Sequence, residues 1–223
     1  MNKRVSLIDH EFKAGFEFIK HQPKSVTFFG SARLPADNEH YQRASRLGYK
    51  LAKEGFSVIS GGGPGIMEGA NRGAFEANGR SIGLNIKLPH EQSVNPYVKS
   101  SIEFYYFFVR KVMLSFSAEA YLFFPGGFGT FDELFEILTL VQTNRIEKTP
   151  IFLVGNEYWN SVKDLLIKVM LGNKTIEEKD LSLFTITEDE DLIVETVKKM
   201  PIRNGVRFTY KEADKEINEP IGS

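Results

Sequence analysis

Short apolar runs alternate with helical patterns along most of this chain, and this alternation constrains its fold more than any other feature. Strands joined by helices at intervals of 25–30 residues form βαβ units, which build a parallel sheet with right-handed crossovers. The runs are continuously apolar, as expected for strands covered on both faces. We therefore predict one α/β domain, a doubly wound, mostly parallel sheet with helices on both faces. The expected strands cover residues 25–30, 56–60, 81–86, 101–106, 119–123, 150–155 and 183–186.

The chain of 223 residues suits a single sheet with its helices, and we divide it into three parts. Residues 1–23 form an N-terminal helical extension, in which Asp9 is the expected N-cap of a helix over 9–20. We expect residues 24–200 to form the main α/β domain and residues 201–223 to form a polar C-terminal tail. Further helical patterns cover 41–55, about 66–77, 157–171 and 189–199, and two more follow residues 106 and 130.

Charge and composition exclude several classes of function. With 28 Lys and Arg against 29 Asp and Glu, the net charge of −1 disfavours a broadly basic nucleic-acid-binding protein. The chain has no cysteine, and its four histidines show no metal-ligand spacing, so we expect neither a metal site nor a cofactor. No window reaches the roughly 18 apolar residues that span a bilayer. Without the apolar core of a signal peptide at the N-terminus, we expect a cytoplasmic protein that does not bind membranes.

Three glycine-bearing loops follow expected strands, and they point to an anionic ligand. In an open α/β sheet such loops meet at the carboxyl edge, where ligands bind. Glycine lets backbone N–H groups approach a phosphate closely, and a helix N-terminus adds partial positive charge. The alternative is that these glycines only make tight turns, but three loops at one edge favour a phosphorylated small molecule. The loops cover residues 30–33, 61–65 and 125–130.

Two common nucleotide motifs are not met. Glycines fall at 61, 62, 63, 65 and 69, which does not fit the dinucleotide pattern G-x-G-x-x-G. The next expected strand ends in Asn85 and Lys87, without the carboxylate that would hold an adenosine ribose. The P-loop pattern G-x-x-x-x-G-K-[ST] does not occur. NAD binding and P-loop nucleotide hydrolysis are therefore both disfavoured.

Polar residues beside the loops allow both a structural and a functional interpretation. Thr130 and Glu133 have the T-x-x-E spacing of a capping box, but they also fit a phosphate donor and a base at the mouth of a cleft. Arg110 and Lys111 lie near a helix start, where two cations oppose the macrodipole unless an anion is near. Alternatively they are a solvated pair.

Several motifs resemble the LONELY GUY (LOG) family of nucleoside 5′-monophosphate phosphoribohydrolases. PGGFGTFDE at 125–133 is similar to the family signature PGGxGTxxE, and Arg110-Lys111 stands where the family has its RK pair. The resemblance covers about residues 24–160 and includes FFGSAR (28–33), SGGGPGIMEGANRGA (60–74) and ELFEILTLVQT (133–143). Many relatives have carried the label lysine decarboxylase. The sequence does not support that activity, because no lysine has the sequence context of a pyridoxal-phosphate site.

The resemblance implies hydrolysis of the N-glycosidic bond of AMP, or of an N6-modified AMP such as a cytokinin nucleotide, to the free base and ribose 5-phosphate. It also implies that residues 24–200 are a Rossmann-like nucleotide-monophosphate-binding domain. It assigns Arg110 and Glu133 as the catalytic pair. The alternative from another class is a nucleotide sensor of the same fold that binds without hydrolysis. A single-stranded-DNA-binding protein of related fold is disfavoured by the charge. The expected substrate-binding residues are Gly126, Gly127, Gly129, Thr130, Lys111, Gly30, Ser31, Gly62, Gly63 and Glu91.

The resemblance also implies a homodimer or a higher homo-oligomer with sites close to the subunit interface. The aromatic-rich run at 104–108 and the apolar helix after Arg110 are the candidates for that interface. Ordinary core packing is the alternative for both segments.

Overall fold

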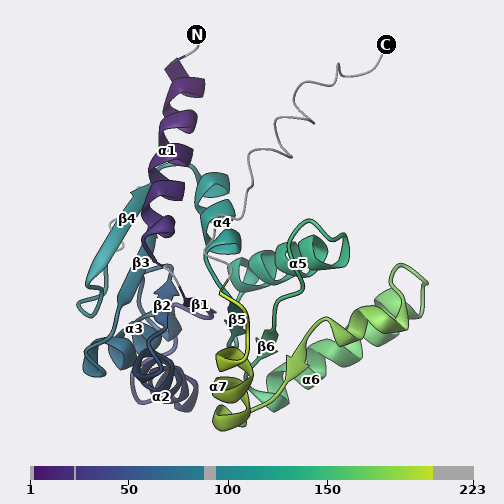
Figure 1. The fold of residues 1–223 in the computed structure, drawn as a ribbon. Coiled ribbons are helices and arrows are strands. Elements are labelled where there is room, and N and C mark those ends of the chain that lie inside the picture. Colours follow the sequence, from purple (N-terminus) through teal and green to yellow (C-terminus); the bar gives the residue numbers. More distant parts are fainter. Residues whose placement is uncertain (1–2, 23, 88–93, 203–223) are drawn as a thin grey trace, which may run out of the picture.

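A seven-stranded sheet forms the centre of the molecule in the computed structural model, which describes residues 3–22, 24–87 and 94–202 (Figure 1). Every strand pairs in parallel with its neighbours, in the order β4-β3-β2-β1-β5-β6-β7. The predicted doubly wound parallel sheet is therefore confirmed. The strands are β1 (Ser25–Phe29), β2 (Ser57–Ser60), β3 (Ser81–Ile86), β4 (Ser100–Phe104), β5 (Ala120–Phe123), β6 (Ile151–Leu153) and β7 (Thr185–Ile186).

The strand order reverses direction between β1 and β5. The chain first builds outward from β1 through β2 and β3 to β4, and then returns to place β5 on the other side of β1. Thr27 in the middle of β1 consequently faces Ile59 of β2 on one side and Tyr121 of β5 on the other. Such a switch point opens a crevice at the carboxyl ends of the two strands, because the connections leave in opposite directions.

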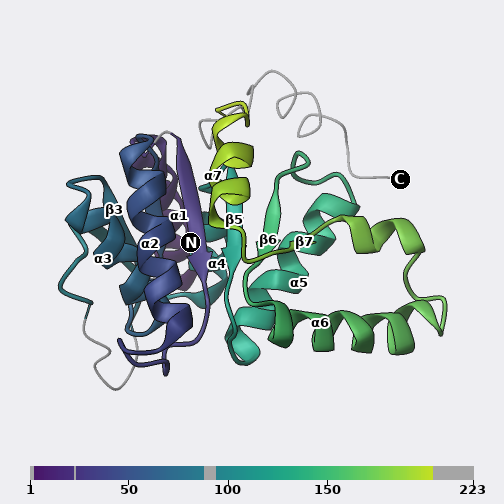
Figure 2. The same cartoon turned by 90° about the horizontal axis from the view of Figure 1, so that it is seen from below.

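Helices cover both faces of the sheet, and the strand side chains alternate between two apolar cores. Phe28 and Leu122 pack in the core under α2, α3 and α7, whereas Phe29 and Phe123 pack in the core under α1, α4, α5 and α6. Figure 2 shows α7 and α6 on opposite sides of β5 and β6. The helices are α1 (Lys3–Lys20), α2 (Glu39–Lys53), α3 (Ile66–Glu76), α4 (Phe107–Phe116), α5 (Phe128–Gln142), α6 (Asn156–Leu165) and α7 (Glu190–Lys198).

The N-terminal helix begins earlier than the sequence predicts. Asp9 lies inside α1 and pairs with Lys13 one turn later (2.8 Å), so its expected role as N-cap is wrong. The helix is anchored on α4, since Phe16 packs edge-on against Phe116 and the Glu11 carboxylate accepts the backbone N–H of Tyr105 (2.7 Å). The division at residues 23 and 200 stays a prediction, and residues 203–223 of the expected tail lie outside the described part.

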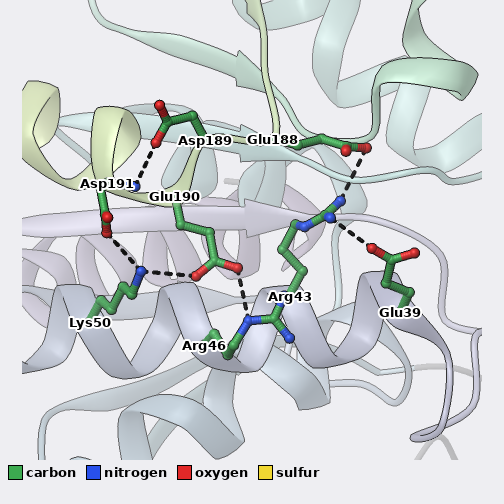
Figure 3. A network of polar contacts seen from close by, with 8 residues as sticks. All are labelled: Glu39, Arg43, Arg46, Lys50, Glu188, Asp189, Glu190 and Asp191. Atoms are coloured by element: carbon green, nitrogen blue, oxygen red, sulfur yellow. Dashed lines mark hydrogen bonds and ion pairs between the residues drawn. The ribbon is translucent and has the colours of Figure 1, made fainter.

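An ion-pair network joins α2 to the segment that leads into α7 (Figure 3). Arg46 Nε lies 2.9 Å from Glu190 Oε1, and Lys50 Nζ lies 2.8 Å from Asp191 Oδ1. Pairs with an exposed partner contribute about 0–1 kcal/mol each, so the apolar contacts of α7 dominate its attachment. The network consists of Glu39, Arg43, Arg46, Lys50, Glu188, Glu190 and Asp191.

Two further elements differ from the sequence prediction in detail. The helix expected over 157–171 is α6 followed by a π-helical turn, η1 (Leu166–Leu171), and a short 3-10 helix, η2 (Glu178–Ser182), precedes β7. The strand expected at 101–106 ends at Phe104, because the next residues turn into α4. Within the described ranges, no helix has both the length and the apolar character needed to cross a membrane.

Candidate functional site

The loops after β1 and β5 meet at the switch point and line an open pocket of about 760 Å³. The backbone N–H of Ser31 donates to the Pro125 carbonyl (3.0 Å), which fixes the two loops against each other. The loop at 61–65 also meets them, because the N–H of Ile66 directly after it donates to the Ser31 carbonyl (3.0 Å), so the three glycine-bearing loops come together at one edge. The pocket is lined by Ser31, Ala32, Arg33, Gly126, Gly127, Phe128, Gly129 and Phe131.

Residues 126–130, which we call the glycine cradle, form the floor of this pocket and the start of α5. A Cβ built on Gly127 or Gly129 meets no atom within 4 Å, so both glycines face open space. A Cβ on Gly126 would collide with the side chain of Thr130, which is buried against it. Among the described residues, no acceptor faces the N–H groups at 127, 128 and 129. Free N–H groups at a helix start are the donor set that binds a phosphate.

The start of α5 overturns the capping-box interpretation of T-x-x-E. Gly127 is the N-cap and the helix begins at Phe128, so Thr130 lies inside the first turn and cannot cap it. The backbone N–H of Thr130 donates to the Gly127 carbonyl (3.0 Å). Glu133 lies one turn further along and has no capping role.

Glu133 is buried, with 9% of its surface exposed, and its Oε2 atom has no hydrogen-bond partner among the described residues. Burial raises the pKa of this carboxyl to about 7, while the positive charges of Lys111 and Arg110 oppose that rise. An unpartnered buried carboxylate costs stability, and carboxyls with a pKa raised in this way cluster at functional sites. Glu133 is four residues beyond Gly129 and thus on the same face of α5, about one helical turn or roughly 6 Å along the axis.

Arg110 reaches this region from the first turns of α4. Its Nε donates to the Leu84 carbonyl at the end of β3 (2.7 Å), and its guanidinium lies against Gly61, where a Cβ would overlap it. Burial lowers the pKa of the Arg110 guanidinium, and the Glu133 carboxylate partly offsets this effect. The predicted pair of Arg110 and Glu133 is therefore electrostatically coupled. Position 61 requires glycine, because any side chain there would overlap the Arg110 guanidinium.

Lys111 forms ion pairs with two carboxylates of α5. Its Nζ pairs with Asp132 Oδ2 (2.9 Å) and with Glu136 Oε2 (3.0 Å). Burial lowers the pKa of Lys111, but these two carboxylates more than offset this and raise it. Lys111 therefore connects α4 to α5 and acts on Glu133 through its charge, and substrate contact by Lys111 stays a prediction.

The second glycine loop is held by a buried amide network. Asn95 donates through Nδ2 to the Gly63 carbonyl (3.0 Å) and to Asn71 Oδ1 (3.0 Å), and its backbone N–H donates to the Gly62 carbonyl (2.8 Å). The Ser60 hydroxyl also donates to Asn71 Oδ1 (2.6 Å). These bonds use the carbonyls of Gly62 and Gly63, and neither glycine lines the pocket described above.

The remaining predicted residues are only partly brought together. Gly30 is small because a Cβ there would come within 2.8 Å of Ile66, whereas Ser31 lines the pocket. Glu91 lies outside the described residues. The sequence reasoning missed Arg33, an exposed cation on the pocket wall, although its place directly after β1 in FFGSAR is a usable signal. Within the described ranges, no three His, Asp or Glu side chains are grouped to hold a metal ion.

This arrangement can bind a phosphate at one end and act on a group about one helical turn away. The cradle supplies N–H donors, Arg33 supplies a cation, and Glu133 and Arg110 supply an acid–base group with an oriented positive charge. Residues 67–197, more than half of the chain, match the family model described as "Possible lysine decarboxylase".

Curated relatives carry the name cytokinin riboside 5′-monophosphate phosphoribohydrolase. The protein of Rhodococcoides fascians is 27% identical over 148 residues, which cover 61% of this chain and 71% of the relative. A probable enzyme of this name from Oryza sativa subsp. japonica is 29% identical over 148 residues, covering 64% of this chain and 58% of the relative.

A solved structure shares the fold. The molybdenum cofactor binding protein of Rippkaea orientalis superimposes with a TM-score of 0.58 at 24% identity, covering 78% of this chain and 96% of that protein.

Proposed function

We propose that this chain is a hydrolase of nucleoside 5′-monophosphates. It belongs to the LOG family, whose family model is described as possible lysine decarboxylase. It cleaves the N-glycosidic bond of AMP or an N6-modified AMP and releases the free base and ribose 5-phosphate. The observation that carries this proposal is the buried, unpartnered carboxylate of Glu133, one helical turn from an open glycine cradle.

The glycine cradle binds the 5′-phosphate in this proposal. The N–H groups at 127, 128 and 129 donate to its oxygens, and the dipole of α5 and the cation of Arg33 favour its charge. Binding at this remote end positions the ribose so that its C1′ atom comes near Glu133. A nucleoside without phosphate loses this positioning and is a poor substrate.

Glu133 acts on the reacting carbon. As the bond between C1′ and the base nitrogen breaks, its electrons leave with the base, and C1′ gains oxocarbenium character. The Glu133 carboxylate stabilises that positive charge and takes a proton from the attacking water, whose oxygen bonds to C1′. The departing base takes up a proton, and Glu133 releases the proton that it took from water. The hydroxyl group of water thus ends on C1′, one proton ends on the base, and the carboxylate is regenerated. The positive charge of Arg110 lowers the pKa of Glu133 and so favours the carboxylate form that the reaction needs.

Lysine decarboxylation is not the proposed reaction. A Schiff-base lysine needs a lowered pKa so that its neutral amine can attack. The pKa of Lys111 is raised, because Asp132 and Glu136 outweigh the lowering effect of its burial. Lys111, the lysine next to the candidate site, is therefore held in its charged form, whereas a Schiff-base lysine must be neutral to attack.

The proposal is tested by base release from a panel of AMP, GMP, CMP, UMP and isopentenyl-AMP. Chromatography should detect free base and ribose 5-phosphate in equal amounts from at least one purine nucleotide. Measurable AMP binding without any base release would instead support the nucleotide sensor, and the ranking of the panel would identify the preferred base.

The pH dependence of kcat/KM is expected to follow Glu133. The reaction needs the carboxylate, and burial raises its pKa to about 7, so kcat/KM should rise with pH through a midpoint near 7. Because the second ionisation of a phosphate also falls near pH 6, a control must separate the two groups.

Glu136→Gln supplies that control. The negative charge of Glu136 raises the pKa of Glu133, and its removal also leaves the cation of Lys111 less neutralised. Both effects lower the pKa of Glu133, so the midpoint should move to lower pH while the ionisation of the nucleotide stays the same. A midpoint that does not move in this variant would assign the profile to another group.

We further propose that exposed aromatic side chains near α4 contact a second copy of the chain. The interior side of α4 is buried, but Tyr105, Phe107 and Phe108 are each about half exposed or more. Contiguous exposed apolar surface of this kind typically marks an interface. We expect a dimer or larger assembly by analytical ultracentrifugation and its dissociation by Phe107→Glu, whereas a monomeric wild-type protein would contradict this.

A further inference from the structure

We propose that Tyr158 is a positioning residue for the glycine cradle, an inference that rests on the proposed function and extends it to α6. Its hydroxyl donates to the Gly126 carbonyl (2.6 Å), a contact between residues 32 positions apart in the sequence. Tyr158 touches neither the proposed substrate position nor Glu133, and it acts through the backbone of the cradle.

The geometry of a peptide unit explains the effect. In a planar trans peptide the C=O and the following N–H point in opposite directions. When Tyr158 holds the carbonyl of Gly126, the N–H of Gly127 is aimed to the other side of the same unit. Gly126 and Gly127 line the pocket at the switch point, whereas Tyr158 lies behind them in a separate pocket with Pro125. The Tyr158 hydroxyl therefore orients a donor of the cradle from outside.

The neighbouring carbonyls show why this bond matters. The Pro125 carbonyl accepts the N–H of Ser31 (3.0 Å), and the Gly127 carbonyl accepts the N–H of Thr130 (3.0 Å). With the Tyr158 bond, each of three successive carbonyls has a donor, and all three peptide planes are fixed. Since Gly126 and Gly127 have no side chain of their own to restrict rotation, loss of the central bond frees the peptide unit between them.

Tyr158 is itself held firmly. Its ring packs edge-on against Trp159 (5.0 Å between centroids) and near Phe131 of α5 (6.3 Å). The turn into α6 lies against Pro125, because a Cβ on Gly155 would lie 3.2 Å from the proline ring. A hydroxyl on a fixed ring orients its acceptor with little entropic cost, which is the property that a positioning residue needs.

The test compares Tyr158→Phe with wild type, because phenylalanine keeps the ring packing and removes only the hydroxyl. The matched control is Ser161→Ala, which removes a hydroxyl from the same helix that donates to Glu157 rather than to the cradle. For Tyr158→Phe we expect KM for AMP to rise about five- to tenfold, the effect of one neutral hydrogen bond, with kcat within twofold of wild type. For Ser161→Ala both constants should stay within twofold.

Calorimetric titration with AMP separates this inference from the proposed function. The titration uses the Glu133→Gln background, so that the nucleotide is not consumed, and Tyr158→Phe should weaken the Kd by the same five- to tenfold. An unchanged Kd and KM would overturn the role of Tyr158, even if the thermal midpoint falls, since a structural role alone predicts that pattern. AMP binding without base release by the wild type would overturn the hydrolase only, and absence of AMP binding would overturn both.

Discussion

Glu133→Gln protein is expected to bind AMP but to release adenine at least about a thousandfold more slowly than wild type. Glutamine keeps the shape of the side chain but removes the charge that stabilises the oxocarbenium-like state and the base that activates water, and such groups contribute factors of about 10²–10⁴ each. Chromatographic measurement of adenine at pH 8 decides the outcome. Release within tenfold of wild type would show that Glu133 is not catalytic.

The same variant has an expected signature in stability. The pKa of Glu133 is raised from 4.5 to about 7, so the folded state holds its proton more tightly than the unfolded state. The stability linked to this group is complete below pH 4.5 and is lost as pH rises through 7, a total on the order of 3 kcal/mol. Glutamine does not ionise, and the variant should therefore be more stable than wild type at pH 8 by about 1–3 kcal/mol in urea unfolding.

Glu136→Gln is the matched control, since the same chemical change is made one turn further along α5 in a residue that pairs with Lys111. Its base release at pH 8 should stay within a few-fold of wild type. An equal loss in both variants would indicate a general effect of charge on α5 rather than a specific role of Glu133.

Arg110→Met is expected to lower kcat/KM for AMP by about 10²–10³-fold, the usual cost of removing one preorganised donor or cation from an active site. Because the guanidinium lowers the pKa of Glu133, its loss should also move the midpoint of the pH profile to higher pH. The variant leaves the Leu84 carbonyl without its donor, so we expect about 1–3 kcal/mol of destabilisation. Steady-state kinetics across pH 5–9 and urea unfolding measure the three effects.

Arg46→Met removes the same positive charge far from the cradle, in the network between α2 and α7 (Figure 3). It should leave kcat/KM and the pH midpoint unchanged. If the two variants lower kcat/KM equally, or if Arg110→Met leaves the midpoint in place, Arg110 does not act on Glu133.

The strands, their parallel pairing and the meeting of the glycine loops could be predicted from the sequence, because continuous apolar runs and strand-to-helix glycines are local patterns with one dominant structural solution. The helix starts were less predictable. Asp9 and Thr130 are good N-cap residues, yet α1 begins at Lys3 and α5 at Phe128. Tertiary contacts decide both cases: α1 packs on α4, and the cradle leaves N–H groups at the start of α5 open to the pocket.

Other parts of the site depend on contacts between distant segments, which sequence patterns do not contain. Lys111 looks equivalent to Arg110 in the sequence, but successive helical residues point about 100° apart, and only Lys111 reaches Asp132. The pairing of Tyr158 with Gly126 spans 32 positions. Only the fold shows that the carbonyls of Gly62 and Gly63 are used by Asn95.

The most direct test of the central claim compares base release from AMP and from adenosine by the wild-type protein under identical conditions. If the glycine cradle binds the 5′-phosphate and thereby positions C1′ beside Glu133, kcat/KM for AMP should exceed that for adenosine by at least about a thousandfold, because remote binding energy drives the reaction. Equal rates of adenine release from the two compounds would contradict the account.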